Sequence, residues 1–293
     1  MRHIFLMQQV MTVFLLGANV AVGNGMVPDG FRVSLLGPTK VIQGEPVLLT
    51  LRVENTSQLS RYIVVPEIRR FGPKTVLFRL ATANAATFED IQYPDIYIGG
   101  MKNLPPKPLP VQCLQSGMTA EFNFTLMYDF PVVTKRKRLF DRPGTYTVEV
   151  TIFEPKSVPQ DRLDIPYDAE KNPITPEPFS FEIIPPENAM DKMALARLIE
   201  LPDEYLLYAP ETFRSDCHAE AIMKIAEMFR DFSQTRYGRY CALPLGVALN
   251  TMSIDIDRKK IETILESAGQ EKDFPLHREA MIVLEKMRRS KSN

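Results

Sequence analysis

The chain has 293 residues, of which 45% are hydrophobic, and a formal net charge of −1. This length has room for one large domain or two ordinary ones. A nearly neutral chain offers no electrostatic basis for binding nucleic acid or an anionic membrane surface. Beyond the first 23 residues, no apolar run approaches the roughly 20 residues that a membrane-spanning helix needs.

The N-terminus has the pattern of a secretory signal peptide. A positively charged start at residues 1–3 is followed by an almost wholly apolar run at residues 10–22, too short to span a bilayer. Ala21 and Gly23 are the small residues that signal peptidases recognise before a cleavage site. The pattern predicts a signal peptide at 1–23, cleaved between Gly23 and Asn24, and therefore a secreted or periplasmic protein. A buried N-terminal helix and an uncleaved anchor are the alternatives.

Residues 31 to about 185 alternate between apolar and polar side chains, as half-buried strands do. In the segment 46–55, one face carries the four apolar residues Val47, Leu49, Leu51 and Val53. Turns rich in Gly, Pro and Asn separate the segments, which favours an antiparallel β-sandwich. The expected strands are 31–36, 46–55, 62–65, 75–80, 91–98, 120–127, 144–153 and 179–184.

From Pro186 onward the apolar spacing becomes helical. The clearest stripe is formed by Ile222, Ile225 and Phe229, at intervals of three and four residues. Pro244 is expected to bend its helix or delay its start, and Pro275 suits a first helical position. The expected helices are 187–201, 217–232, 237–249, 257–268 and 275–289.

Two turn motifs flank strands of the first half. One is Gln-Gly-Glu-Pro-Val at 43–47, and the other is the Pro-Gly turn at 143–144 that precedes Tyr146. On these motifs the segment 31–185 resembles the immunoglobulin-like β-sandwiches of exported bacterial proteins, which implies that Tyr146 packs at a sheet corner. The chain departs from that pattern in its long, Pro-rich connections at 99–117 and 154–178, and it lacks the Cys…Trp…Cys core of antibody domains.

The second half contains a helical-hairpin pattern. Its helix at 223–233 ends in Phe232 and Ser233, and Arg236, Tyr237 and then Leu245-Gly246 follow. The region at about 216–250 resembles the tetratricopeptide-type hairpins of exported bacterial proteins, although Cys241 and Pro244 depart from that pattern. A helical bundle packed on the sandwich is the alternative. The expected organisation is a multidomain chain: a signal peptide at 1–23, an all-β antiparallel immunoglobulin-like sandwich at 24–185, and an all-α helical-hairpin domain at 186–293.

Three cysteines, Cys113, Cys217 and Cys241, lie after the expected cleavage site. An exported protein can oxidise its thiols, so a bridge between Cys217 and Cys241 is one interpretation. Three buried, unreactive thiols are the other. No Cys-x-x-Cys spacing is present, so a zinc knuckle is not expected.

Residues with the chemistry for catalysis are few and scattered. His218 directly follows Cys217, so their side chains diverge by about 100° on a helix, and His277 begins the last expected helix. No phosphate-binding, dinucleotide-binding, serine-hydrolase or zinc-protease motif occurs. We therefore expect no catalytic site, no metal and no cofactor.

The function that fits these observations is a non-catalytic binding or scaffold protein of the cell envelope or exterior. Both modules commonly present surfaces to protein partners. The expected partner-binding residues are Arg236, Tyr237, Arg239 and Tyr240, because aromatic and arginine side chains are typical interface anchors. The same tyrosines packing between helices is the alternative for these residues. For the whole chain, the alternative function is a hydrolase or accessory subunit with a site between the two domains.

Overall fold

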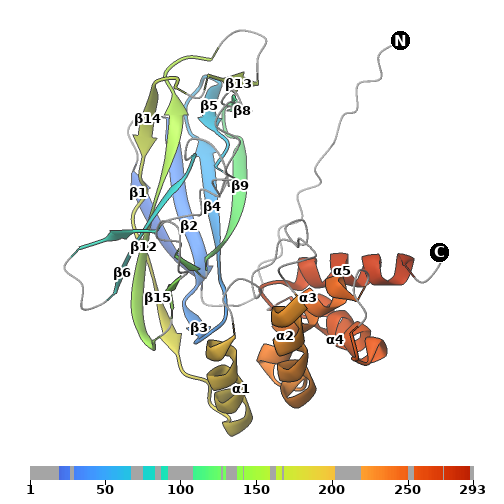
Figure 1. Ribbon diagram of the computed structural model, residues 1–293. Coiled ribbons are helices and arrows are strands. Elements are labelled where there is room, and N and C mark those ends of the chain that lie inside the picture. The colour runs from blue at the N-terminus through green and yellow to red at the C-terminus, as the bar shows by residue number, and fades with distance from the viewer. Residues whose placement is uncertain are drawn as a thin grey trace, which may run out of the picture.

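The structure, a computed structural model, describes residues 20–26, 30–66, 75–82, 87–91, 108–126, 128–129, 137–140, 142–158, 163–166, 168–201, 219–249, 254–272 and 274–290. In the described part, a β-rich region is followed by five helices, so the chain combines mainly antiparallel sheets with an α-helical region (Figure 1). The helices lie beside the lower end of the β-rich region in this view, near strand β3. Within the described residues, no helix is both long and apolar enough to cross a membrane.

One sheet has the strand order β1-β2-β4-β9. Its strands are β1 (Val20–Met26), β2 (Phe31–Pro38), β4 (Val47–Asn55) and β9 (Thr119–Leu126), and all neighbours are antiparallel. The alternation expected for β4 is confirmed, because its odd-numbered residues from Val47 to Asn55 are all buried. Strand β1 spans the expected cleavage site between Gly23 and Asn24, so its first part belongs to the expected signal peptide.

A second sheet has the order β3-β15-β12-β6-β7, with β14 also pairing with β12. Its long central strand is β12 (Gly144–Pro155), antiparallel to β6 and β15, whereas β3 runs parallel to β15. The bounds of the other strands are Lys40–Ile42 for β3, Leu77–Thr82 for β6, Glu89–Asp90 for β7, Lys171–Ile174 for β14 and Phe179–Ile184 for β15.

Side chains from both sheets share one hydrophobic core. Phe78 and Phe124, one from each sheet, meet edge to face with ring centroids 5.1 Å apart. At the edge of this core, the hydroxyl of Tyr146 donates a hydrogen bond of 2.9 Å to the carbonyl of Arg142. Tyr146 is buried against Phe140 and Phe181. Burial of both sheets against each other is therefore what holds the β-rich region together.

The connections 99–117 and 154–178 contain more regular structure than the sequence indicated. Strand β8 (Leu109–Leu114) lies between β13 (Asp164–Ile165) and β5 (Arg61–Val64), and β14 also falls in the second connection. The prolines in these connections made the segments resemble linkers in the sequence, because proline is a poor strand former. A further pair joins β10 (Tyr128–Asp129) to β11 (Lys137–Arg138). The expected strand at 91–98 lies outside the described residues except for Ile91.

The helices are α1 (Ala189–Glu200), α2 (Ala219–Phe232), α3 (Arg236–Ala248), α4 (Arg258–Gln270) and α5 (His277–Arg289). Side chains of Asn188, Thr235 and Asp257 cap α1, α3 and α4. Helix α3 includes Pro244 in its interior, and its start at Arg236 is not delayed. Pro275 precedes α5 rather than opening it, since Leu276 is the N-cap.

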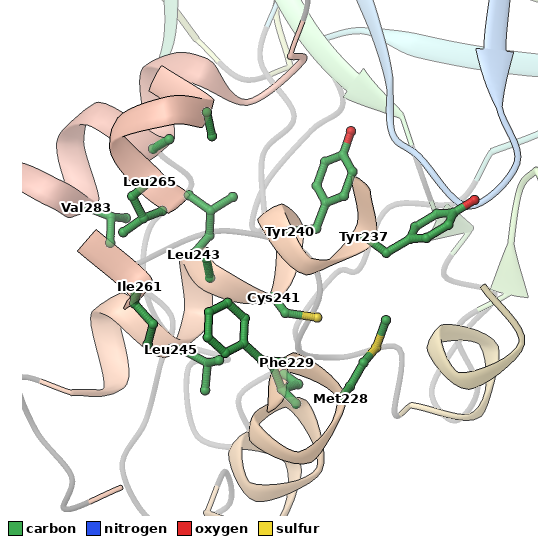
Figure 2. Close-up of a cluster of buried hydrophobic side chains, with 14 of the residues drawn as sticks. Met228, Phe229, Tyr237, Tyr240, Cys241, Leu243, Leu245, Ile261, Leu265 and Val283 are labelled. Carbon is green, nitrogen blue, oxygen red and sulfur yellow. The ribbon is translucent and has the colours of Figure 1, made fainter. Parts of the chain in front are cut away.

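Helix α3 lies at the centre of the second hydrophobic core, to which all five helices contribute. Gly246 permits the close packing that its position suggests: a Cβ there would lie 2.6 Å from Cγ1 of Val283 and 2.9 Å from Sδ of Met287. Figure 2 shows Phe229, Leu243, Leu245, Ile261 and Leu265 gathered around this helix. This packing fixes the orientation of α3, and the first turn of the helix faces the β-rich region.

Candidate functional site

A tight turn after β3 brings the β-rich region to the helices. Gln43 donates its backbone N–H to the carbonyl of Ile184 at 2.8 Å, and Glu45 donates to Ile42 at 3.0 Å. Between them, Gly44 has a φ of 85°, a conformation that side chains rarely adopt. The turn therefore needs glycine for its backbone alone.

Gly44 is also needed for space. A Cβ at this position would lie 2.6 Å from Cδ1 of Leu195 on α1 and 3.2 Å from Cε1 of Tyr237 on α3. The hydroxyl of Tyr237 donates a hydrogen bond of 2.6 Å to the carbonyl of Gln43. In Figure 2 the Tyr237 ring extends from α3 toward the blue ribbon of the β-rich region. The turn is thus held between two helices by both shape and a hydrogen bond.

Charged groups surround this contact. Nη1 of Arg236 lies 3.0 Å from Oε1 of Glu45, and Nε of Arg236 lies 3.8 Å from Oδ2 of Asp191. The Glu45 and Asp191 side chains are only 13% and 11% exposed, so both carboxylates are largely removed from water. One guanidinium therefore links a carboxylate of the turn with a carboxylate of α1. Gln43, Glu45, Asp191, Arg236 and Tyr237 are called the junction cluster below.

Asp191 has additional partners that hold it in place. Nδ2 of Asn188 donates to its Oδ2 at 2.6 Å, and the backbone N–H of Asp191 donates to Oδ1 of Asn188 at 2.7 Å. The backbone N–H of Arg236, at the first residue of α3, donates to Oδ1 of Asp191 at 3.2 Å. Asp191 thus stabilises the N-terminus of its own helix and that of α3, where a negative charge is favourable.

Burial changes the acid–base properties of the cluster. It raises the pKa of Glu45 above the ordinary value, and the Arg236 guanidinium and the nearby Tyr240 hydroxyl oppose this only in part. Burial also raises the pKa of Tyr237 far above its ordinary value, and the nearby charge of Glu45 adds to that effect. The Tyr237 hydroxyl therefore stays protonated and remains a donor to Gln43 at every physiological pH.

The four residues expected to bind a partner have partners inside the chain. Tyr237 is fully buried and Tyr240 is 4% exposed, with its ring centroid 4.9 Å from that of Phe274. Arg236 belongs to the junction cluster, and Arg239 forms an ion pair with Glu271. The side chains of Arg236 and Arg239 each remain 35% exposed, whereas the turn after β3 and the α4–α5 connection cover the two tyrosines. Their packing matches the alternative in which the tyrosines lie between elements of the chain.

The other chemically active residues are kept apart. Cys241 is a free and fully buried thiol, and burial raises its pKa to about 12. The bridge between Cys217 and Cys241 stays a prediction, because Cys217 and His218 lie outside the described residues. Nδ1 of His277 lies 3.1 Å from the carbonyl oxygen of Phe274, in the turn before α5. In the described part of the chain, no three His, Cys, Asp or Glu side chains gather as metal ligands do.

The sequence did not reveal the partners of Arg236 and Tyr237. Gln43 and Glu45 precede them by more than 190 residues, and periodicity carries no information over that distance. The local signals were a glycine before Glu45 and the Asn-x-x-Asp spacing at 188–191, which is typical of a helix N-terminus. Those signals predict a turn and a cap but do not indicate that the two meet.

The junction cluster is a set of hydrogen bonds and ion pairs that connects two parts of the chain. The described hydrogen bonds and ion pairs of Glu45, Asp191 and Arg236 join the turn after β3 to α1 and α3. Each buried charge has an opposite charge or a donor beside it, as burial requires. What this arrangement does is fix the β-rich region against the first turn of α3.

No protein-family model and no curated protein matches the sequence. A beta-glucosidase from Listeria innocua matches 52% of this chain with 13% identity and a TM-score of 0.25. The alkylpurine DNA glycosylase of Pseudomonas fluorescens, bound to DNA with an abasic site analogue, matches 58% with 15% identity and a TM-score of 0.24. A structure described as pT26-6p matches 90% with 10% identity and a TM-score of 0.24.

The matched regions are small parts of those proteins. They amount to 16% of the glucosidase, 31% of the glycosylase and 48% of pT26-6p. The TM-scores all lie below 0.5, so nothing known of those proteins is carried over to this chain.

Proposed function

We propose that the chain is an exported, non-catalytic protein of the cell envelope or exterior that binds a protein partner. In this proposal residues 24–185 form an immunoglobulin-like β-sandwich, and residues 186–293 form a tetratricopeptide-like or bundled helical domain. The hydrogen bond from the Tyr146 hydroxyl to the carbonyl of Arg142 supports the sandwich assignment, because a tyrosine bonded in this way at a sheet corner is typical of immunoglobulin-like sandwiches. The packing of α2 on α3 and of α4 on α5 supports the second.

The observation that carries partner binding is the outer face of α1. Met190 and Met193 are 51% and 57% exposed, although methionine usually lies inside. They are three residues apart, so they lie on the same side of the helix, and Arg197 follows one turn later. Met190, Met193 and Arg197 are called the α1 outer face below. Methionine and arginine are both enriched at protein–protein interfaces.

Methionine also suits this role physically. Its unbranched, polarizable side chain adapts to partners of different shape. Met281 and Ile282 on α5 are exposed to a similar degree, but they are consecutive and therefore point about 100° apart. They do not share one face, so α5 offers a matched control with equally exposed apolar side chains.

The experiment is capture of partners from the envelope fraction of the source cells. Wild-type bait is compared with Met190→Asp/Met193→Asp and with Met281→Asp/Ile282→Asp. The proposal expects a defined protein on the wild-type and α5-variant baits that the α1 variant loses. Equal capture by all three baits, each confirmed as folded by circular dichroism, would contradict it.

One observation favours the alternative of a hydrolase with a site between the two regions. Glu45 has a raised pKa and lies beside Arg236 and Asp191, and such carboxyl groups are candidates for acid–base catalysis. The test is a panel of esters, peptides and glycosides with the wild type, Glu45→Gln and Asp191→Asn. A turnover that both variants lose, with their folds intact, would support this alternative over the binding role.

A further inference from the structure

The first sheet ends in a strand that the proposed export would remove in part. β1 pairs with β2 along its whole length, from Val20 opposite Pro38 to Met26 opposite Arg32. Cleavage between Gly23 and Asn24 would cut β1 in its middle. Only Asn24 to Met26 would then remain beside β2.

The loss falls on one end of β2. Leu35, Leu36, Gly37 and Pro38 are the residues whose partners in β1 precede the cleavage point. Backbone groups of this segment that face β1 would lose their ladder partners. An unpaired strand edge is a template for an incoming strand.

In the uncleaved chain the core side of β2 is closely packed around Leu35, whereas Gly37 is half-buried. Leu35 is fully buried, and a Cβ on Gly37 would lie 2.7 Å from Cδ2 of Leu49 and 3.1 Å from Cε1 of Phe179. The two β1 positions opposite Leu35 and Gly37 are occupied by Gly23 and Ala21, which are the smallest residues. Residues opposite each other in an antiparallel pair share a face. An occupant therefore needs small residues at the positions that face the core.

The other face accepts larger residues. Leu36 and Pro38 are only half-buried, and the β1 residues opposite them are Val22 and Val20. The register thus defines an occupant in which apolar and small residues alternate. A shift by one residue would direct the larger side chains into the filled core side, so the pattern also sets the register.

We propose that the β2 edge from Leu35 to Pro38 is a strand-binding site of the exported protein. It takes an antiparallel, extended segment of another polypeptide that places glycine or alanine opposite Leu35 and Gly37 and apolar residues between them. Main-chain hydrogen bonds to β2 supply the affinity, and the filled core side supplies the selectivity. This inference rests on the proposed export, because the uncleaved chain fills the edge with its own residues.

The test uses a fluorescent peptide with the sequence of residues 20–26, Val-Ala-Val-Gly-Asn-Gly-Met, and the folded chain 24–293. We expect saturable binding that weakens about tenfold or more when the peptide carries Ala21→Leu and Gly23→Leu, because the core side is already filled. The peptide with Val22→Leu is the matched control and should bind within about twofold of the parent. The intact chain 1–293 should bind about tenfold more weakly than 24–293, since its own strand competes.

Binding that is absent from 24–293, equal for both leucine-substituted peptides, or equal for the two chains would overturn the strand-binding site. The proposed export is tested separately, by N-terminal sequencing of the protein recovered from the source cells. A start at Asn24 supports export, and a start at Met1 refutes it whatever the peptide does.

Discussion

The hydroxyl of Tyr237 donates a 2.6 Å hydrogen bond to the backbone carbonyl of Gln43, 194 residues earlier in the chain. Tyr237 belongs to the first turn of α3 and is fully buried, whereas Gln43 belongs to the turn after β3. The bond therefore joins the helical core to the β-rich region beside the ion pair of Arg236 and Glu45. Because water cannot replace the lost partner easily, this contact couples the two regions energetically.

Replacing Tyr237 with Phe should lower the free energy of unfolding by about 1 kcal/mol, the usual net value of a buried hydrogen bond. The measurement is urea unfolding followed by tyrosine fluorescence and by circular dichroism. Tyr146→Phe is the control, because it removes a comparable bond of 2.9 Å that lies wholly inside the β-rich region. Only Tyr237→Phe should separate the unfolding of the helices from that of the sheets. Coincident transitions in both variants would contradict the coupling.

Gly44→Ala should destabilise the chain more than Gly117→Ala. Both glycines have positive φ, 85° and 75°, so both substitutions strain the backbone by about 1–2 kcal/mol. Only at Gly44 would the new Cβ also meet Leu195 and Tyr237, because nothing lies within 4 Å of the corresponding position at Gly117. The expected difference, about 1–3 kcal/mol from overpacking, is measured by thermal and urea unfolding. Equal losses would mean that the turn does not press against the helices.

The pH dependence of stability should carry the signature of Glu45. The pKa of the Glu45 carboxyl is raised in the folded chain, so the folded chain binds this proton more tightly than the unfolded chain does. Its contribution to stability is then greatest below its ordinary pKa of about 4.5 and is lost as the pH rises through the higher folded value. Glu45→Gln should flatten the decline in stability as the pH rises above about 4.5.

Glu170→Gln provides the control of opposite sign. Lys156 lowers the pKa of Glu170, so this exposed carboxylate contributes stability above its ordinary pKa and loses it as the pH falls. Removing it should slightly flatten the acid limb of the profile instead. If Glu45→Gln left the profile unchanged, or altered it in the same sense as Glu170→Gln, the burial of Glu45 against Arg236 would be contradicted.

Asn55→Ala should cost about 2–4 kcal/mol, because a fully buried side chain loses several hydrogen bonds at once. Nδ2 of Asn55 donates to the carbonyls of Leu59 at 2.8 Å and Leu114 at 2.7 Å, and its Oδ1 accepts from Ser57. Asn123→Ala is the matched control, since Asn123 is exposed and accepts one bond from Thr50. Urea unfolding should show a loss of less than about 0.5 kcal/mol for the control. Similar losses for the two variants would contradict this structural role.

The parts of the fold with a regular pattern were predictable from the sequence. The expected strand 179–184 coincides with β15 at both ends, because strict alternation over a short segment leaves no ambiguity of register. Strand β8 was missed because Pro110 lies within it, and β3 because three residues are too few for a pattern. For the site, the residue types drew attention to Arg236 and Tyr237 but did not indicate that these side chains contact the turn after β3. Their partners are set by tertiary packing, which local spacing does not encode.

The α1 outer face is the part of the proposed function that a single measurement tests most directly. A photo-crosslinking amino acid is placed at position 193 or, as a control, at position 281 of the protein in its source cells. Met193 and Met281 are both exposed, at 57% and 47%, so the two probes have similar access to solvent. We predict a discrete crosslink to another protein from position 193 and none from position 281. Absence of any intermolecular product from position 193, or identical products from both positions, would contradict the proposed role as a partner-binding protein.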